Sequence, residues 1–137
     1  MVTIALSKGK LIESALDLFR RAGYTITGLS ADSRRLIFIS PEHDMTFLIV
    51  RPSDVPTYVE YGGADAGIVG KDVLMEQESD VYEPLDLGFG ACRIAVAALQ
   101  GEEMGVRLSS KVRIATKYPR ISERYFNTRG IPVEIVK

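Results

Sequence analysis

Apolar and polar residues follow two different periods in the first third of the chain. Residues 2–6 form a short apolar run typical of a buried strand, and apolar residues then recur at helical spacing over 11–22 until Gly23 interrupts the pattern. We therefore expect a strand, a turn and a helix in that order. Two further apolar runs, 36–39 and 46–50, flank the sequence SPEHDM, whose proline, serine and aspartate favour a turn. This arrangement predicts an antiparallel hairpin.

Strand-like and helix-like segments alternate through the rest of the chain. PSDVPTYVEYGG predicts a helix capped by Ser53, and KDVLMEQESD and PRISERYFNTRG predict two more helices. The expected strands are ADAGIVG, VYEPLDL, ACRIAVAAL, VRIAT and PVEIV. This alternation predicts an α/β fold with a mainly parallel sheet. A change of pattern around GFGAC predicts two lobes, 1–89 and 90–137, the second of which begins with a crossover.

The last predicted element is an apolar strand that runs to Lys137. Parallel sheets are normally covered by helices on both faces, and no helix follows this strand. We therefore expect a truncated chain whose second lobe is incomplete.

Charge and composition narrow the classes of function. Seventeen basic and eighteen acidic residues give a net charge of -1, so no overall positive field would attract nucleic acid or an anionic membrane. With a single cysteine, Cys92, and a single histidine, His43, we expect neither an internal disulfide nor a zinc cluster, and no resident metal. The N-terminus does not resemble a secretory leader, and no apolar run has the length of a membrane span. We expect a cytoplasmic protein.

Basic residues gather in the loops after the predicted strands. Ligands of open α/β sheets bind at the carboxyl ends of the strands, where SKGK, RPSD, VGKD and TKYPR each place a lysine or arginine near a helix start. Backbone N–H groups and the positive end of a helix favour an anion there, so these loops predict a phosphate site. The alternative is a solvated surface lysine, since no P-loop or GxGxxG motif is present. In TKYPR, Tyr118 beside Lys117 either stacks on a base or covers apolar surface.

Several other residues have both a structural and a functional interpretation. Arg34 and Arg35 precede a predicted strand, where such charges either discourage aggregation at a sheet edge or bind a ligand. Arg51 needs a partner, which is either a ligand anion or Asp54. Asp72 either caps a helix or accepts hydrogen bonds from a ligand.

Taken together, the loops resemble one family along essentially the whole chain. The segments LSKGKL, DSRRLIF, RPSDVPTYVEYGGADAGIVGKDVL, VYEPLDL and VRIATKYPRISERYF resemble, in this order, those of ATP phosphoribosyltransferase, most closely its short form. The resemblance implies a periplasmic-binding-protein-like fold of type II, with two α/β lobes and a cleft between them. Family segments of the types LNGS, ELAP and STGxTL, which complete the second lobe and grip the ribose 5-phosphate, are absent from this sequence.

The resemblance also implies a reaction and a set of roles. N1 of ATP attacks C1 of 5-phosphoribosyl-1-pyrophosphate and expels magnesium-bound pyrophosphate, which gives phosphoribosyl-ATP in the first step of histidine biosynthesis. Lys10 and Arg34 would stabilise the leaving pyrophosphate, and lysine stands at position 10 where the family commonly has arginine. The other implied substrate-binding residues are Lys8, Arg35, Arg51, Asp72, Lys117 and Tyr118.

The resemblance extends to a partner. Short-form members work with a histidyl-tRNA-synthetase-like regulatory subunit, so a hetero-oligomer is implied, with Mg²⁺ as the cofactor. The alternative from another class is a non-catalytic module of the same two-lobed fold that binds an amino acid or an oxyanion. A titration with ATP separates the two hypotheses, because such a module would ignore ATP.

Overall fold

Two compact units make up the chain in the computed structural model, which describes residues 1–30, 33–100 and 112–136. The units are Met1–Ala91 and Cys92–Lys137, and each is described by itself. Their correspondence to the two lobes of the resemblance stays a prediction.

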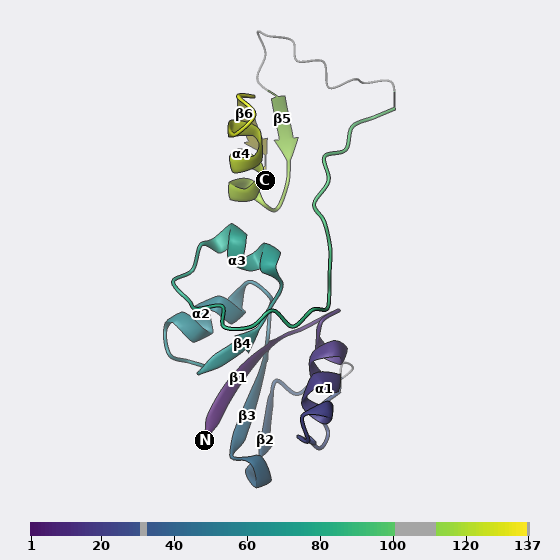
Figure 1. The fold of residues 1–137 in the computed structure, drawn as a ribbon, viewed down its shortest axis with the longest axis vertical. Helices are drawn as coiled ribbons and strands as arrows, with labels where there is room; N and C mark the ends of the chain where they lie inside the picture. The colour runs from purple at the N-terminus through teal and green to yellow at the C-terminus, as the bar shows by residue number, and fades with distance from the viewer. Residues whose placement is uncertain (31–32, 101–111, 137) are drawn as a thin grey trace. The chain divides into compact units, whose positions relative to one another are not determined.

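The first unit is built on a four-stranded sheet (Figure 1). Strands β1 (Val2–Ser7), β3 (Met45–Val50) and β4 (Ala66–Ile68) run parallel, and β2 (Ile37–Ser40) pairs antiparallel with β3, in the order β2-β3-β1-β4. A single 3-10 turn, Pro41–His43, joins β2 to β3. The predicted hairpin and the mainly parallel sheet are therefore confirmed for this unit.

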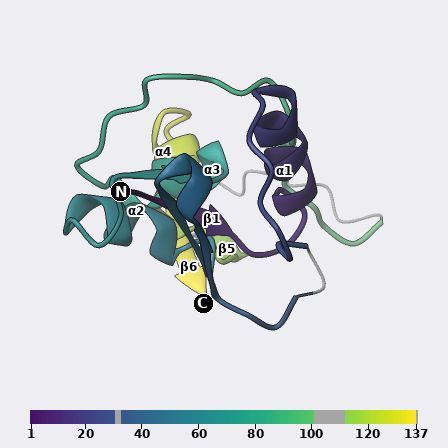
Figure 2. The same ribbon diagram turned by 90° about the horizontal axis from the view of Figure 1, so that it is seen from below.

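Two helices cover opposite faces of the sheet. Side chains alternate along β1, so Leu6 faces α1 (Ile12–Arg21) while Ala5 faces α2 (Asp54–Glu60). Figure 2 shows α1 and α2 on either side of β1. The third helix, α3 (Lys71–Gln77), follows β4. Among the described residues, no helix has the length and apolarity that crossing a membrane requires.

The main core lies between α1 and the sheet. Phe47 has no exposed surface, and its ring meets Phe19 of α1 edge-on with 5.2 Å between the ring centroids. The other buried members of this core are Ile4, Leu6, Ile12, Ala15, Leu16, Leu29, Phe38 and Ile49. On the opposite face, α2 approaches β4 closely at Gly67, where a Cβ atom would collide with Val55.

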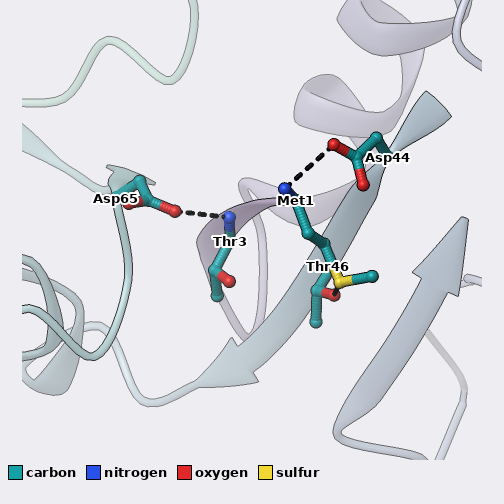
Figure 3. Close-up of polar contacts among 5 residues, drawn as sticks. All are labelled: Met1, Thr3, Asp44, Thr46 and Asp65. Atoms are coloured by element: carbon teal, nitrogen blue, oxygen red, sulfur yellow. Dashed lines mark hydrogen bonds and ion pairs between the residues drawn. The ribbon is translucent and has the colours of Figure 1, made fainter.

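Polar contacts fix the first residues of β1 (Figure 3). The backbone N–H of Thr3 donates to Oδ2 of Asp65 over 2.7 Å, and the N–H of Asp65 donates to the carbonyl of Thr3 over 2.8 Å. The amino group of Met1 forms an ion pair with Asp44 at 2.9 Å, and the hydroxyl of Thr46 donates to the Met1 sulfur over 3.0 Å. Since β4 begins only at residue 66, the Asp65 side chain extends the pairing between β1 and β4.

Replacing Asp65 by alanine is expected to lower the free energy of unfolding by about 1 kcal/mol, because the Thr3 N–H loses its acceptor. Chemical denaturation of the purified chain measures this change. Asp80→Ala, at an exposed position, is the matched control and should stay within about 0.5 kcal/mol of the unchanged chain. Equal losses in the two variants would contradict the role of Asp65.

The described residues of the second unit, 92–100 and 112–136, contain one parallel strand pair and one helix. β5 (Val112–Ala115) pairs with β6 (Val133–Val136), and α4 (Pro119–Asn127) connects them. Phe126 of α4 is 2% exposed, and its carbonyl accepts a hydrogen bond from the N–H of Ile131 over 3.0 Å, which closes the turn toward β6. The predicted strands VRIAT and PVEIV and the predicted helix PRISERYFNTRG are confirmed.

Two predicted strands are wrong. VYEPLDL and ACRIAVAAL, which together fall within residues 81–99, contain neither helix nor strand. An apolar segment forms a strand only when a neighbouring strand completes its backbone hydrogen bonds. None of the described strands pairs with either segment. Their large apolar side chains are accordingly exposed, with Tyr82 at 99%, Leu85 at 73% and Leu99 at 74%.

Candidate functional site

The carboxyl ends of the three parallel strands lie at one edge of the first sheet (Figure 1). Ser7 at the end of β1 is in register with Val50 at the end of β3, and β4 continues the sheet on the other side of β1. β2 runs in the opposite direction, and the carbonyl of Leu36 accepts a hydrogen bond from the N–H of Ile49 over 2.8 Å. The arginines before β2 therefore belong to the same edge as the loops after β1, β3 and β4.

The chain reverses its direction across the sheet at β1, since β3 lies on one side of β1 and β4 on the other. After β1 it passes to α1 on one face, and after β3 it passes to α2 on the other face and continues to β4 beyond β1. Ligands of open α/β sheets bind in the crevice at such a switch point. The topology therefore places the candidate site around the carboxyl end of β1, at the loop 8–11 and the loops that follow its neighbours β3 and β4.

The loop after β1 carries two exposed lysines. The N–H of Lys8 donates to the carbonyl of Val50 over 2.8 Å, which holds the start of this loop against the end of β3. Gly9 has φ of 115°, a left-handed conformation that side-chain-bearing residues rarely adopt, and its carbonyl accepts a hydrogen bond from the N–H of Ile12 over 3.2 Å. Lys8 and Lys10 thus lie in a fixed turn, with both side chains exposed to solvent.

The loop after β3 carries Arg51, whose side chain is exposed. The carbonyl of Arg51 accepts a hydrogen bond from the N–H of Asp54 over 2.9 Å, and the Ser53 hydroxyl donates to Oδ1 of Asp54 over 3.1 Å. Among the residues that the structure describes, no ion pair joins Arg51 to Asp54. Asp54 is therefore not the partner of this guanidinium, and the ligand interpretation of Arg51 stays a prediction. Ser53 occupies the predicted cap position of α2, but its hydroxyl donates to Asp54 and accepts no capping bond from the backbone of the helix.

The structure distinguishes the two neighbouring arginines. The guanidinium of Arg35 lies over the ring of Phe38, 5.3 Å from its centroid. The backbone N–H of Arg35 donates to the Ser33 hydroxyl over 3.2 Å. Arg34 is exposed and has no ion pair or hydrogen bond to any of the described residues. Arg35 thus has a structural contact, whereas Arg34 is the arginine whose charge is available to a ligand.

The loop after β4 contains a lysine that already forms an ion pair, and next to it an aspartate. The ammonium of Lys71 forms an ion pair with Glu83, so its charge is largely compensated. The cap position of α3 is occupied by Gly70, and Asp72 is the second residue of the helix. The Asp72 carboxylate lies against Gly70, where a Cβ atom would collide with its Oδ1. Asp72 is half-buried at the edge that carries the two lysines.

Lys117 and Tyr118 belong to the second unit. The N–H of Tyr118 donates to the hydroxyl of Thr116 over 3.0 Å, and the Lys117 ammonium lies over the Tyr118 ring, 4.9 Å from its centroid. Pro119 then begins α4. A hydrogen bond within the loop therefore holds the loop after β5, as hydrogen bonds hold the loops after β1 and β3.

One residue of the site escaped the sequence analysis. The side-chain amide of Gln77, the last residue of α3, donates to the carbonyl of Ser53 over 2.6 Å. The two residues are 24 positions apart, and no motif links them. Only the packing of α3 beside the loop after β3 reveals the contact.

Besides Arg35, which contacts Phe38, and Lys71, which is paired with Glu83, four exposed cations lie at this edge of the first unit: Lys8, Lys10, Arg34 and Arg51. Because the net charge of the chain is -1, this concentration of positive charge is local. Two guanidinium groups and two ammonium groups at the ends of parallel strands can bind a diphosphate or triphosphate through charge-assisted hydrogen bonds. In the described residues, no group of three His, Cys, Asp or Glu side chains could hold a metal ion without such a ligand.

Comparison with known proteins agrees with this chemistry. The family model described as HisG, ATP phosphoribosyltransferase, matches residues 51–137. The chain belongs to the ATP phosphoribosyltransferase family. Relatives of this family include ATP phosphoribosyltransferase of Syntrophotalea carbinolica, 51% identical over 139 residues, and ATP phosphoribosyltransferase 2 of Geobacter sulfurreducens, 52% identical over 138 residues. Each match covers 99% of this chain, but only 63% and 65% of the respective relative.

A solved structure of the same family shares the fold. It is described as the ATP phosphoribosyl transferase (HisG:HisZ) complex from Thermotoga maritima, and it matches with a TM-score of 0.72 and 27% sequence identity. The match covers 99% of this chain and 63% of the Thermotoga chain. The mixed α/β architecture is therefore that of a family member, and the chain spans just under two thirds of the length of the relatives it matches.

Proposed function

We propose that this chain is the part of an ATP phosphoribosyltransferase that binds ATP and the leaving pyrophosphate. The enzyme transfers the phosphoribosyl group of 5-phosphoribosyl-1-pyrophosphate to N1 of ATP. The observation that supports the proposal best is the gathering of Lys8, Lys10, Arg34 and Arg51 at the switch-point edge, in a chain of this family. No observation favours the alternative of a non-catalytic module.

The chemistry requires fixed positive charge more than a protein nucleophile. The bond between C1 and the pyrophosphate oxygen breaks with its electron pair going to the pyrophosphate, while the lone pair of adenine N1 forms the new bond to C1. Lys10 and Arg34 stabilise the negative charge that accumulates on the departing oxygens, which favours the transition state over the bound substrates. The other residues bind the substrates, with phosphates at Lys8, Arg35 and Arg51, hydroxyl or amino groups at Asp72, and the adenine ring at Lys117 and Tyr118.

Mg²⁺ fits this site as a part of the substrate. Asp72 offers one carboxylate at the edge, and the described residues hold no cluster that would bind the ion by itself. Mg²⁺ bound to the substrate phosphates would neutralise part of the charge on the leaving pyrophosphate. The cationic side chains of the chain contact the remaining phosphate oxygens.

The proposal extends to fold, partner and location. The whole protein has two lobes of the type II periplasmic-binding-protein kind with the reaction in the cleft, and it works in the cytoplasm. A histidyl-tRNA-synthetase-like subunit regulates it in a hetero-oligomer. The Thermotoga maritima structure, described as a HisG:HisZ complex, supports this partner.

A chimera tests the proposed activity. It joins this chain to the part of the Geobacter sulfurreducens relative that the chain does not span, and it is incubated with ATP, 5-phosphoribosyl-1-pyrophosphate and Mg²⁺, with and without the regulatory subunit. We expect phosphoribosyl-ATP, identified by its mass, and we expect calorimetry to show that the chain alone binds ATP. A folded chimera that forms no product under either condition would refute the enzyme. Binding of an amino acid or an oxyanion without any binding of ATP would favour the alternative.

A further inference from the structure

The side-chain amide of Gln77 connects α3 to the loop that carries Arg51. Its nitrogen donates to the carbonyl of Ser53 over 2.6 Å, and its oxygen accepts a hydrogen bond from the hydroxyl of Ser79 over 3.4 Å. Both ends of the amide are thus engaged, which fixes its orientation. The contact joins the last residue of α3 to the loop after β3.

Within the part of the chain that the structure describes, few other hydrogen bonds hold the loop 51–53. Its first peptide follows Val50, whose carbonyl accepts from Lys8, and a single turn bond runs from the N–H of Asp54 to the carbonyl of Arg51. The Ser53 hydroxyl is used locally by Asp54 and makes no capping bond to α2. The bond from Gln77 is therefore the long-range contact that the structure shows for the middle of this loop.

The helix that carries Gln77 is itself anchored. Lys71, at the first position of α3, forms an ion pair with Glu83 in the segment that follows the helix. This ion pair ties the start of α3, at the opposite end of the helix from Gln77, so the helix has an anchor that does not depend on the Gln77 bond.

Arg51 lies two residues before the carbonyl that Gln77 holds. A guanidinium binds phosphate well only when its planar fork is presented in a fixed direction, and an unrestrained loop populates that direction for only part of the time. When the fraction of molecules whose loop is in the binding conformation falls, the apparent dissociation constant for the ligand rises by the same factor. A bond that orders residues 51–53 therefore acts on ligand affinity without contacting the ligand.

We propose that Gln77 is a positioning residue that orders the loop 51–53 so that Arg51 binds the diphosphate group of the substrate. This inference rests on the proposed function and deepens it by adding a residue that acts through Arg51. The family resemblance assigned no role to Gln77.

A double-mutant cycle tests the inference in the chain as it stands. Inorganic pyrophosphate with Mg²⁺ is titrated by calorimetry into the unchanged chain, Gln77→Met, Arg51→Met and the double variant. Since a net hydrogen bond contributes about 1 kcal/mol, we expect Gln77→Met to weaken binding about fivefold. In the Arg51→Met background, the same substitution should have almost no further effect, because the loop no longer presents a guanidinium.

The chain offers a matched control in Gln100, its other glutamine, which is exposed. Gln100→Met should leave pyrophosphate affinity unchanged. If Gln77→Met prevents folding, Gln77→Glu replaces it, since the carboxylate has nearly the same shape but cannot donate to the Ser53 carbonyl. Gln100→Glu is then the control for the added charge.

The outcomes separate the inference from the function on which it rests. If the unchanged chain binds no pyrophosphate, both the proposed function and the inference fail. If it binds pyrophosphate but Gln77→Met binds equally well, only the inference is overturned. The same holds if Gln77→Met weakens binding to the same degree with and without Arg51, because Gln77 would then act by general stability rather than through this arginine.

Discussion

Alanine in place of Arg34 is expected to lower the turnover of the complete enzyme about a hundredfold, with little change in ATP affinity. Removing one fixed donor from a developing anion typically costs about 3 kcal/mol of transition-state stabilisation. Arg34 is the member of the arginine pair that has no partner among the described residues, so no internal contact competes for its charge. Steady-state kinetics of the chimera, together with ATP titration by calorimetry, measures both quantities.

The control for Arg34 removes an arginine elsewhere in the first unit. Arg21 is exposed in the last turn of α1, and Arg21→Ala should leave turnover within a factor of two of the unchanged enzyme. The role assigned to Arg34 depends on how its loss of turnover compares with its loss of ATP affinity. If Arg34→Ala lowered turnover and ATP affinity equally, Arg34 would hold ATP rather than the leaving group.

The largest expected effect on stability comes from Phe47→Ala. Phe47 is fully buried in β3 between α1 and the sheet, and its ring packs edge-on against Phe19. Truncating a buried phenylalanine removes its transfer free energy and leaves a cavity, which together cost about 3–5 kcal/mol. Small domains are stable by only about 5–15 kcal/mol, so a large fraction of the Phe47→Ala molecules should be unfolded at moderate denaturant concentration.

Denaturant titration followed by circular dichroism measures the Phe47 effect. Tyr61→Ala is the matched aromatic control, since Tyr61 is 81% exposed and its loss should change the free energy of unfolding by less than about 0.5 kcal/mol. An equally small change for Phe47→Ala would mean that β3 does not carry the core of this unit.

Lysine at position 10 changes how the leaving group can be held. An ammonium acts as a point charge and cannot form the paired hydrogen bonds of a guanidinium. Of the three arginines at this edge of the sheet, Arg35 lies over the Phe38 ring, while Arg34 and Arg51 are exposed without such a contact. In the proposed site, directional recognition of the phosphates therefore falls to these arginines, while Lys8 and Lys10 supply charge from the turn around Gly9.

Local sequence patterns predicted an element correctly where the segments that pair with it lie close to it in the sequence. The hairpin of β2 and β3 is confirmed because alternating apolar residues and a proline-containing turn specify both strands and their connection. The basic loops could also be placed at one edge, since parallel strands end together in any α/β sheet. Their residue types and order also carried the family resemblance, which the match over residues 51–137 confirms.

Local patterns failed where the outcome depends on a distant partner. VYEPLDL and ACRIAVAAL have the composition of strands, but a strand forms only where another strand satisfies its backbone, and no described strand does so. Ser53 lies at the cap position that the sequence predicts, but its hydroxyl accepts no capping hydrogen bond from the backbone of α2. Propensity describes what a segment can form, and its partners decide whether it does.

The sequence by itself determined the α/β class, the family and the set of basic loops at the ends of the strands, because each depends on residue type, order and local periodicity. Only the tertiary structure decided which cations are available and what holds them. It placed Arg35 on Phe38, paired Lys71 with Glu83, left Arg34 and Arg51 exposed, and brought the amide of Gln77 to the carbonyl of Ser53. These choices depend on atoms that meet through packing, and a linear pattern does not specify such meetings.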